Sequence, residues 1–134
     1  MNKLRGKIVK IEKGGELSFF TINSFDAPVY AFVVGEEADE FKEGEEVFAL
    51  FKENETVLAE EGSGNIFLEN EFVCEIKEMK RENFLTRVRL SFLECEIVSI
   101  ISSRFFKESD LKVGKKMRVL VKASQMTLMK VDNG

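Results

Sequence analysis

Lys122, Ala123 and Ser124 are consecutive residues whose side chains are suited to holding an anion. They lie inside residues 113–128, between an alternating apolar run and a second, shorter one. The lysine can supply positive charge, the serine a hydroxyl and a backbone N–H, and the alanine room for close approach. Proteins hold a tetrahedral oxyanion with several N–H and O–H donors and usually one cation. The simpler interpretation, a solvated lysine at a strand end before a turn, is the one that local chemistry alone favours.

Catalytic chemistry has little support in the sequence. The chain has no histidine, so it lacks the commonest general base and the commonest transition-metal ligand. No serine or cysteine accompanies a recognisable base, and carboxylates fall in solvated runs such as residues 36–40. We therefore expect a protein that is not an enzyme. Cys74 and Cys95 lie in apolar alternating runs and are expected to be buried thiols.

The segment that carries the triplet occurs twice in the chain. Residues 43–58 and 113–128 align without a gap at an offset of 70, which pairs Gly44 with Gly114, Val47 with Met117, Lys52 with Lys122 and Leu58 with Leu128. The openings align at an offset of 68, which pairs Asn2 with Asn70, Leu4 with Phe72, Gly6 with Cys74 and Ile8 with Ile76. Such a repeat predicts two modules. We place them at residues 1–61 and 66–134, joined by a polar, glycine-containing linker.

Alternating apolar residues predict five short strands in each half, with one helical turn before the fourth strand. In the second half this turn is expected to be a short helix over residues 102–110, capped by Ser102 or Ser103. Each half is expected to close on its own copy of the repeated segment. The pattern is typical of a small barrel of the oligonucleotide/oligosaccharide-binding (OB) type. The predicted fold class is therefore all-β, with two tandem OB-fold-like five-stranded barrels.

Three stretches of the second half resemble the molybdate-binding Mop/TOBE module. Residues 70–76 are similar to its opening N-x-[LF]-x-G-x-V, and Ile101-Ser102 with residues 111–114 are similar to I-T…L-x-x-G. Residues 121–128 are similar to I-K-A-[ST]-x-V-x-L, the most specific of the three. This family includes the molbindins, the sensing half of the molybdate-responsive transcription regulator and the C-terminal domain of molybdate-importer ATPases. The first half matches the opening motif better, at residues 2–8, and the last motif worse.

The resemblance implies that the chain binds molybdate or tungstate for intracellular storage, buffering or sensing. It implies the candidate oxyanion-binding residues Lys122, Ala123, Ser124, Asn70, Ser102, Lys52 and Asn2. In this family sites form between modules and commonly between subunits, so the resemblance also implies a homo-oligomer, either a dimer or a trimer. No helix-turn-helix pattern is present, so we expect no direct reading of DNA.

The chain departs from the family pattern in its donor residues. The family has Ser-Ala-Arg before the opening asparagine, whereas this chain has Phe67-Leu68-Glu69 before Asn70 and Met1 before Asn2. The first-half triplet is Lys52-Glu53-Asn54, and a carboxylate beside a dianion is repulsive unless it points away. We therefore expect the first copy to be weak or silent. Arg104, or Arg5 of a neighbouring module, is a candidate replacement for the missing arginine.

Charge and hydropathy restrict the partners. The net charge of −4 divides into −7 over residues 1–67, from 7 basic and 14 acidic residues, and +3 over residues 68–134, from 13 and 10. The second half is thus the better host for an anion, and the overall acidity argues against nucleic acid. No signal peptide or apolar run of about 18 residues is present, so we expect a cytoplasmic protein without a membrane span.

Two other functions stay open at this stage. A TOBE-like interaction or oligomerisation module could act on a transporter or regulator, such as an importer ATPase, without binding a ligand, and the missing Ser-Ala-Arg supports it. A nucleic-acid binder would need exposed aromatic residues on a basic face. The phenylalanines fall mostly on the apolar phase of the predicted strands, which argues against this second alternative.

Overall fold

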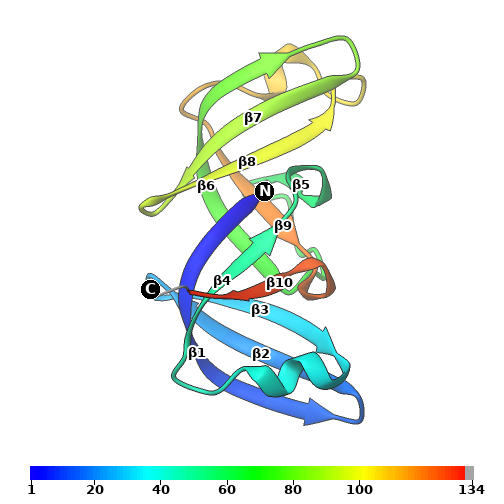
Figure 1. The fold of residues 1–134 in the computed structure, drawn as a ribbon. Coiled ribbons are helices and arrows are strands. Elements are labelled where there is room, and N and C mark those ends of the chain that lie inside the picture. The colour runs from blue at the N-terminus through cyan, green and yellow to red at the C-terminus, as the bar shows by residue number, and fades with distance from the viewer. Residues whose placement is uncertain (132–134) are drawn as a thin grey trace.

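The computed structural model describes residues 1–131 and contains two five-stranded antiparallel sheets (Figure 1). The first half supplies β1 (Asn2–Gly14), β2 (Leu17–Ser24), β3 (Ala27–Val34), β4 (Glu46–Phe51) and β5 (Val57–Glu60). The second half supplies β6 (Asn70–Arg81), β7 (Leu85–Phe92), β8 (Cys95–Ser102), β9 (Lys116–Val121) and β10 (Thr127–Lys130). Short 3-10 turns connect them: η1 (Gly35–Glu40), η2 (Glu53–Glu55), η3 (Glu108–Asp110) and η4 (Ala123–Gln125). The expected all-β class is confirmed, with a helical turn before β4 and before β9.

Each sheet takes its last strand from the other half of the chain. The strand orders are β10-β4-β1-β2-β3 and β5-β9-β6-β7-β8. In Figure 1 the red β10 lies beside β4, and β5 lies beside β9. The expectation that each half closes its own sheet is therefore corrected. Because β4 and β9 are copies of one segment, the burial pattern of β5 or β10 fits either partner, and the sequence alone cannot choose between them.

The connection from β8 to β9 also differs from the expected helix over residues 102–110. Strand β8 continues to Ser102, and only Glu108–Asp110 forms a 3-10 turn. Ser103 is buried, and its hydroxyl lies 2.7 Å from the hydroxyl of Thr86 on β7. Since this cross-strand contact engages the Ser103 hydroxyl, that serine does not cap a helix.

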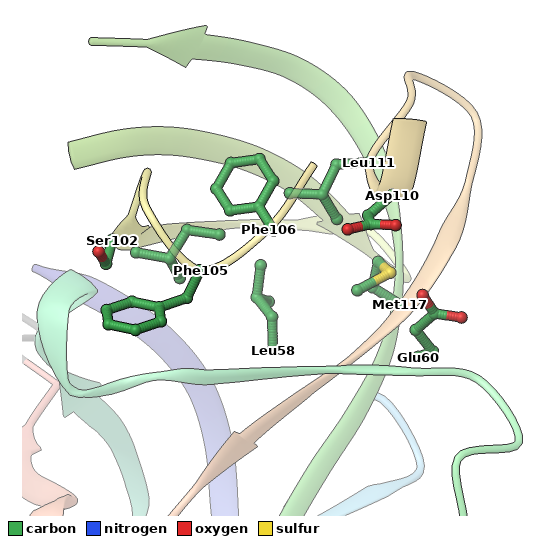
Figure 2. Close-up of a pocket in the computed structure, with 9 residues that line it drawn as sticks. Leu58, Glu60, Ser102, Phe105, Phe106, Asp110, Leu111 and Met117 are labelled. Carbon is green, nitrogen blue, oxygen red and sulfur yellow. The ribbon is translucent and has the colours of Figure 1, made fainter. Parts of the chain in front are cut away.

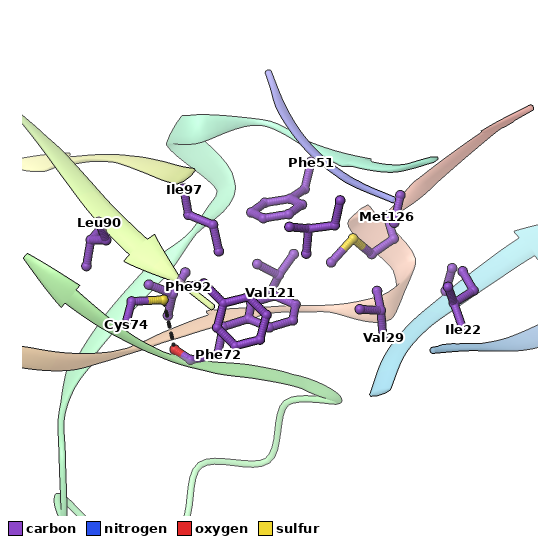
Figure 3. Close-up of a cluster of buried hydrophobic side chains, with 14 of the residues drawn as sticks. Ile22, Val29, Phe51, Phe72, Cys74, Leu90, Phe92, Ile97, Val121 and Met126 are labelled. Atoms are coloured by element: carbon purple, nitrogen blue, oxygen red, sulfur yellow. Dashed lines mark hydrogen bonds between the residues drawn. The ribbon is translucent and has the colours of Figure 1, made fainter. Parts of the chain in front are cut away.

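A single hydrophobic core runs through both sheets (Figure 3). Phe51 of β4 stacks on Phe72 of β6 with ring centroids 6.0 Å apart, and Phe72 packs against Phe92 of β7 at 5.0 Å. Burial of this apolar surface is shared between the halves, each of which is near the lower size limit for an independent core. The halves therefore stabilise each other.

Both cysteines are free thiols, as expected. Cys74 is buried and its Sγ donates to the carbonyl of Phe72 at 3.4 Å (Figure 3), whereas Cys95 is partly buried. Burial raises the pKa of the Cys74 thiol to about 12. This thiol is therefore protonated, and a poor nucleophile, at neutral pH.

Candidate oxyanion-binding site

The structure gathers most of the candidate residues at two equivalent junctions between the sheets. At the first junction, Asn2 pairs with Phe51 across β1 and β4, which places it next to Lys52. At the second junction, Asn70 pairs with Val121 across β6 and β9, which places it next to Lys122. The turn that follows each lysine contacts the edge strand of the other sheet. Turn η2 contacts β8, and turn η4 contacts β3.

The two opening asparagines join the sheets by imitating a peptide group. Asn70 Nδ2 donates to the carbonyl of Tyr30, and Asn70 Oδ1 accepts from the backbone N–H of Tyr30, both at 2.8 Å. Asn2 makes the same two contacts with Val98, also at 2.8 Å. Both asparagines are buried, and Tyr30 and Val98 lie on the edge strands β3 and β8. Each carboxamide thus satisfies backbone groups that an edge strand would otherwise leave unpaired.

At the second junction a carboxylate already binds the repeated segment. The backbone N–H of Ala123 donates to Glu69 Oε1 at 2.8 Å, and Ala123 is fully buried. Lys122 is exposed and has no ion pair with any residue between 1 and 131. This junction therefore offers an N–H that holds an oxygen anion and a nearby cation that no residue of the described part of the chain neutralises.

The turn of the first junction carries two carboxylates, whereas the turn of the second junction carries none. Lys52 Nζ lies 3.9 Å from Glu55, and Glu53 pairs with the amino group of Met1. The hydrogen bond from that amino group lowers the pKa of the Glu53 carboxyl. At an offset of 70, Glu53 and Glu55 correspond to Ala123 and Gln125, which are neutral. The turn after Lys122 therefore places no acidic side chain beside that lysine, and the carboxylate at this junction is that of Glu69 on Ala123.

The two candidate serines line different cavities. Ser124 borders a cavity of about 290 Å³ together with Phe32, Phe41 and Leu128. Ser102, at the end of β8, borders a cavity of about 370 Å³ in the second sheet. Figure 2 shows this second cavity, with Ser102 at one end and apolar side chains such as Leu58 facing it. Ser124 adjoins the second junction through Ala123, whereas Ser102 lies outside both junctions.

Neither candidate for the missing arginine is placed at the second junction. Arg5 forms an ion pair with Glu46. Arg104 stacks over Phe84, 5.1 Å from the ring centroid, and shares a hollow with Arg81.

The expectation that phenylalanines lie mostly on the apolar side of the strands has four exceptions. The exposed phenylalanines are Phe25, Phe67, Phe84 and Phe105.

Sequence reasoning missed the partners of three site residues: the Glu69 carboxylate on Ala123, and the backbone of Tyr30 and Val98 on the two asparagines. Glu69 had one visible signal, its place directly before Asn70 where the family has arginine. The backbone partners had none, because any residue type can offer an N–H and a C=O.

Comparison with known proteins finds similarity among solved structures. No protein family and no curated protein matches the chain. Among solved structures, it matches a crystal structure of the cytoplasmic molybdate-binding protein ModG, in a form with molybdate bound. The TM-score is 0.90 at 23% sequence identity, over 97% of this chain and 96% of the ModG chain. The chain has the fold of ModG.

This match confirms the expected all-β fold along nearly the whole chain. In the part of the chain that the structure describes, no helix is long and apolar enough to cross a membrane. No group of three or more His, Cys, Asp or Glu residues among residues 1–131 is arranged to hold a metal ion.

Proposed function

We propose that this chain binds a tetrahedral oxyanion, molybdate or tungstate, reversibly at the second junction. Its role would be intracellular storage, buffering or sensing in the cytoplasm. The observation that carries the proposal is the fold match, over almost the full length of both chains, with a molybdate-binding protein. The anion is bound and released without a chemical change, so the protein acts as a binder rather than an enzyme.

In the proposed complex, the second junction supplies charge and hydrogen bonds. Lys122 provides the cation, the Ala123 N–H donates to one oxygen, and Ser124 donates through its hydroxyl or backbone N–H. Asn70 holds β6 against β3 through Tyr30 and so fixes the strand that lies beside Lys122. The Glu69 carboxylate occupies the Ala123 N–H in the structure, so a bound oxyanion would take its place.

The remaining candidates have smaller roles in this proposal. Asn2 and Lys52 belong to the first junction, where Glu53 and Glu55 repel a dianion, so that copy is weak or silent. Ser102 lies in a separate cavity. As implied by the family resemblance, we propose a homo-oligomer, a dimer or a trimer, in which neighbouring subunits can complete the donor set. Direct binding to nucleic acid is not part of the proposal.

A calorimetric titration of the purified protein tests the proposal. Molybdate and then tungstate are added, with sulfate and phosphate as controls. We expect saturable binding of molybdate and tungstate, in the micromolar range or tighter, with about one site per chain because only the second junction is suited to a dianion. No heat and no thermal shift with any oxyanion would refute it.

One observation favours a second candidate function, an interaction or oligomerisation module without a ligand. Because Glu69 already satisfies the buried Ala123 N–H, the second junction needs no oxyanion for its hydrogen bonding. The same titration separates the two candidates, since only the module without a ligand gives no signal with any of the four anions. A transporter or regulator protein would then be the partner to seek.

A further inference from the structure

We infer that Glu69 is a built-in competitor for the oxyanion at the second junction. In the structure its carboxylate takes the Ala123 N–H, so an incoming dianion must displace it. The inference rests on the proposed function and deepens it, because it names the residue that sets the affinity of the site and its preference among anions.

The backbone around Glu69 is held in place on both sides of the contact. Glu69 directly precedes Asn70, which is buried, pairs with Val121 and is joined to Tyr30. Ala123 is also fully buried, so its N–H depends on a protein or ligand acceptor rather than on bulk water. Glu69 supplies that acceptor, and a bound oxyanion could supply it equally well.

Glu69 itself is exposed, whereas its chain neighbour Asn70 and its hydrogen-bond partner Ala123 are buried. Its side chain can therefore turn out into water without opening the core. Displacement of Glu69 exchanges one acceptor on the Ala123 N–H for another. It leaves the two hydrogen bonds between Asn70 and Tyr30 intact. The site can thus release Glu69 and bind an anion without a change of fold.

The competition between Glu69 and the ligand depends on the charge of the ligand. A carboxylate and a dianion cannot both approach Ala123, because their repulsion at hydrogen-bonding distance is large and grows with ligand charge. Lys122 attracts the ligand, whereas Glu69 repels it even after it leaves the N–H. Removing the charge of Glu69 should therefore help a dianion more than a monoanion of the same shape.

The test compares Glu69→Gln with the parent protein by calorimetry on the full chain. Glutamine keeps the length of the side chain and an oxygen that can accept from Ala123, so the fold is expected to persist. Glu61→Gln is the matched control, since Glu61 is an exposed linker residue and the change in net charge is the same. The ligands are molybdate, a tetrahedral dianion, and perrhenate, a tetrahedral monoanion.

We expect Glu69→Gln to tighten molybdate binding by about tenfold or more, and perrhenate binding by less. Glu61→Gln should change either affinity by less than about twofold, because solvent and salt screen its charge. Equal molybdate affinity in the parent and in Glu69→Gln would overturn the inference and leave the proposed function standing. Binding by Glu69→Gln alone would support the competitor role and overturn the proposed function for the parent chain. Binding by neither would refute both.

A measurement on the parent protein avoids any dependence on how a variant folds. The amide resonance of Ala123 in a ¹⁵N–¹H NMR spectrum reports the acceptor on that N–H. We expect it to move on saturation with molybdate, and to move in Glu69→Gln without ligand. If molybdate binds but leaves this resonance unmoved, Glu69 is not displaced and the inference fails.

Discussion

Two lysines at equivalent positions, Lys52 and Lys122, differ in their electrostatic surroundings. Lys52 lies near Glu55 and is followed directly by Glu53, whereas Lys122 is followed by the neutral residues 123–125. An ammonium group attracts a dianion only as far as nearby carboxylates leave its charge uncompensated. Single residues in the two turns therefore make two similar junctions electrostatically different.

Replacing Lys122 by alanine should abolish oxyanion binding or weaken it greatly. The substitution removes the cation of the proposed site, and an exposed lysine contributes little to the free energy of unfolding. Titration calorimetry with molybdate measures the first effect, and thermal melting measures the second.

Lys52→Ala is the matched control for that substitution, since it removes the same side chain from the equivalent exposed position. We expect it to leave the molybdate affinity close to that of the parent. If Lys122→Ala binds molybdate as tightly as the parent, Lys122 is not a ligand and the second junction is not the site.

At the scale of elements, the edge strands β3 and β8 are held by side chains rather than by further strands. Asn70 exchanges two hydrogen bonds with Tyr30 on β3, and Asn2 does the same with Val98 on β8. The buried hydroxyls of Thr56, directly after η2, and Ser99 on β8 also contact each other at 2.5 Å. Because an unpaired strand edge can recruit another chain, the asparagines reduce the exposed hydrogen-bonding groups of these edges at Tyr30 and Val98.

Asn70→Ala should lower the free energy of unfolding by about 1–3 kcal/mol, since it leaves the N–H and C=O of Tyr30 without their partner at a partly buried contact. Denaturant unfolding followed by circular dichroism measures the change.

Asn83→Ala serves as the control for the asparagine substitution, because Asn83 is exposed on the hairpin between β6 and β7. Its effect should stay within about 0.5 kcal/mol. A comparably small effect for Asn70→Ala would show that the carboxamide contributes little to joining the sheets.

For the whole molecule, the exchanged strands and the shared core make the two halves interdependent. The first sheet lacks its β10 edge without the second half, and the second sheet lacks its β5 edge without the first. Separating the two halves would also break the stack between Phe51 and Phe72. The full chain is therefore expected to unfold in a single cooperative transition.

Separate fragments of residues 1–65 and 66–134 should each fail to fold, and should regain structure when mixed. The reason is that each fragment exposes core side chains and an unpaired strand edge that the other normally covers. Dispersion of the amide signals in NMR spectra, recorded for each fragment and for the mixture, measures this. A well-dispersed spectrum from either fragment alone would contradict the interdependence.

The sequence alone was enough to predict five strands in each half, the helical turns before β4 and β9, and the equivalence of Lys52 and Lys122. These features follow from local burial periodicity and from the internal repeat, which need no knowledge of distant contacts. The candidate triplet of residues 122–124 was visible in the sequence because its three residues are consecutive.

Only the tertiary structure decided which sheet receives β5 and β10, since β4 and β9 present nearly the same pattern to either strand. It also decided the partners of Asn70 and Ala123. Glu69 and Ala123 are 54 residues apart and meet because Asn70 pairs with Val121. Such contacts depend on the geometry of strand pairing rather than on residue type, so no local pattern reveals them.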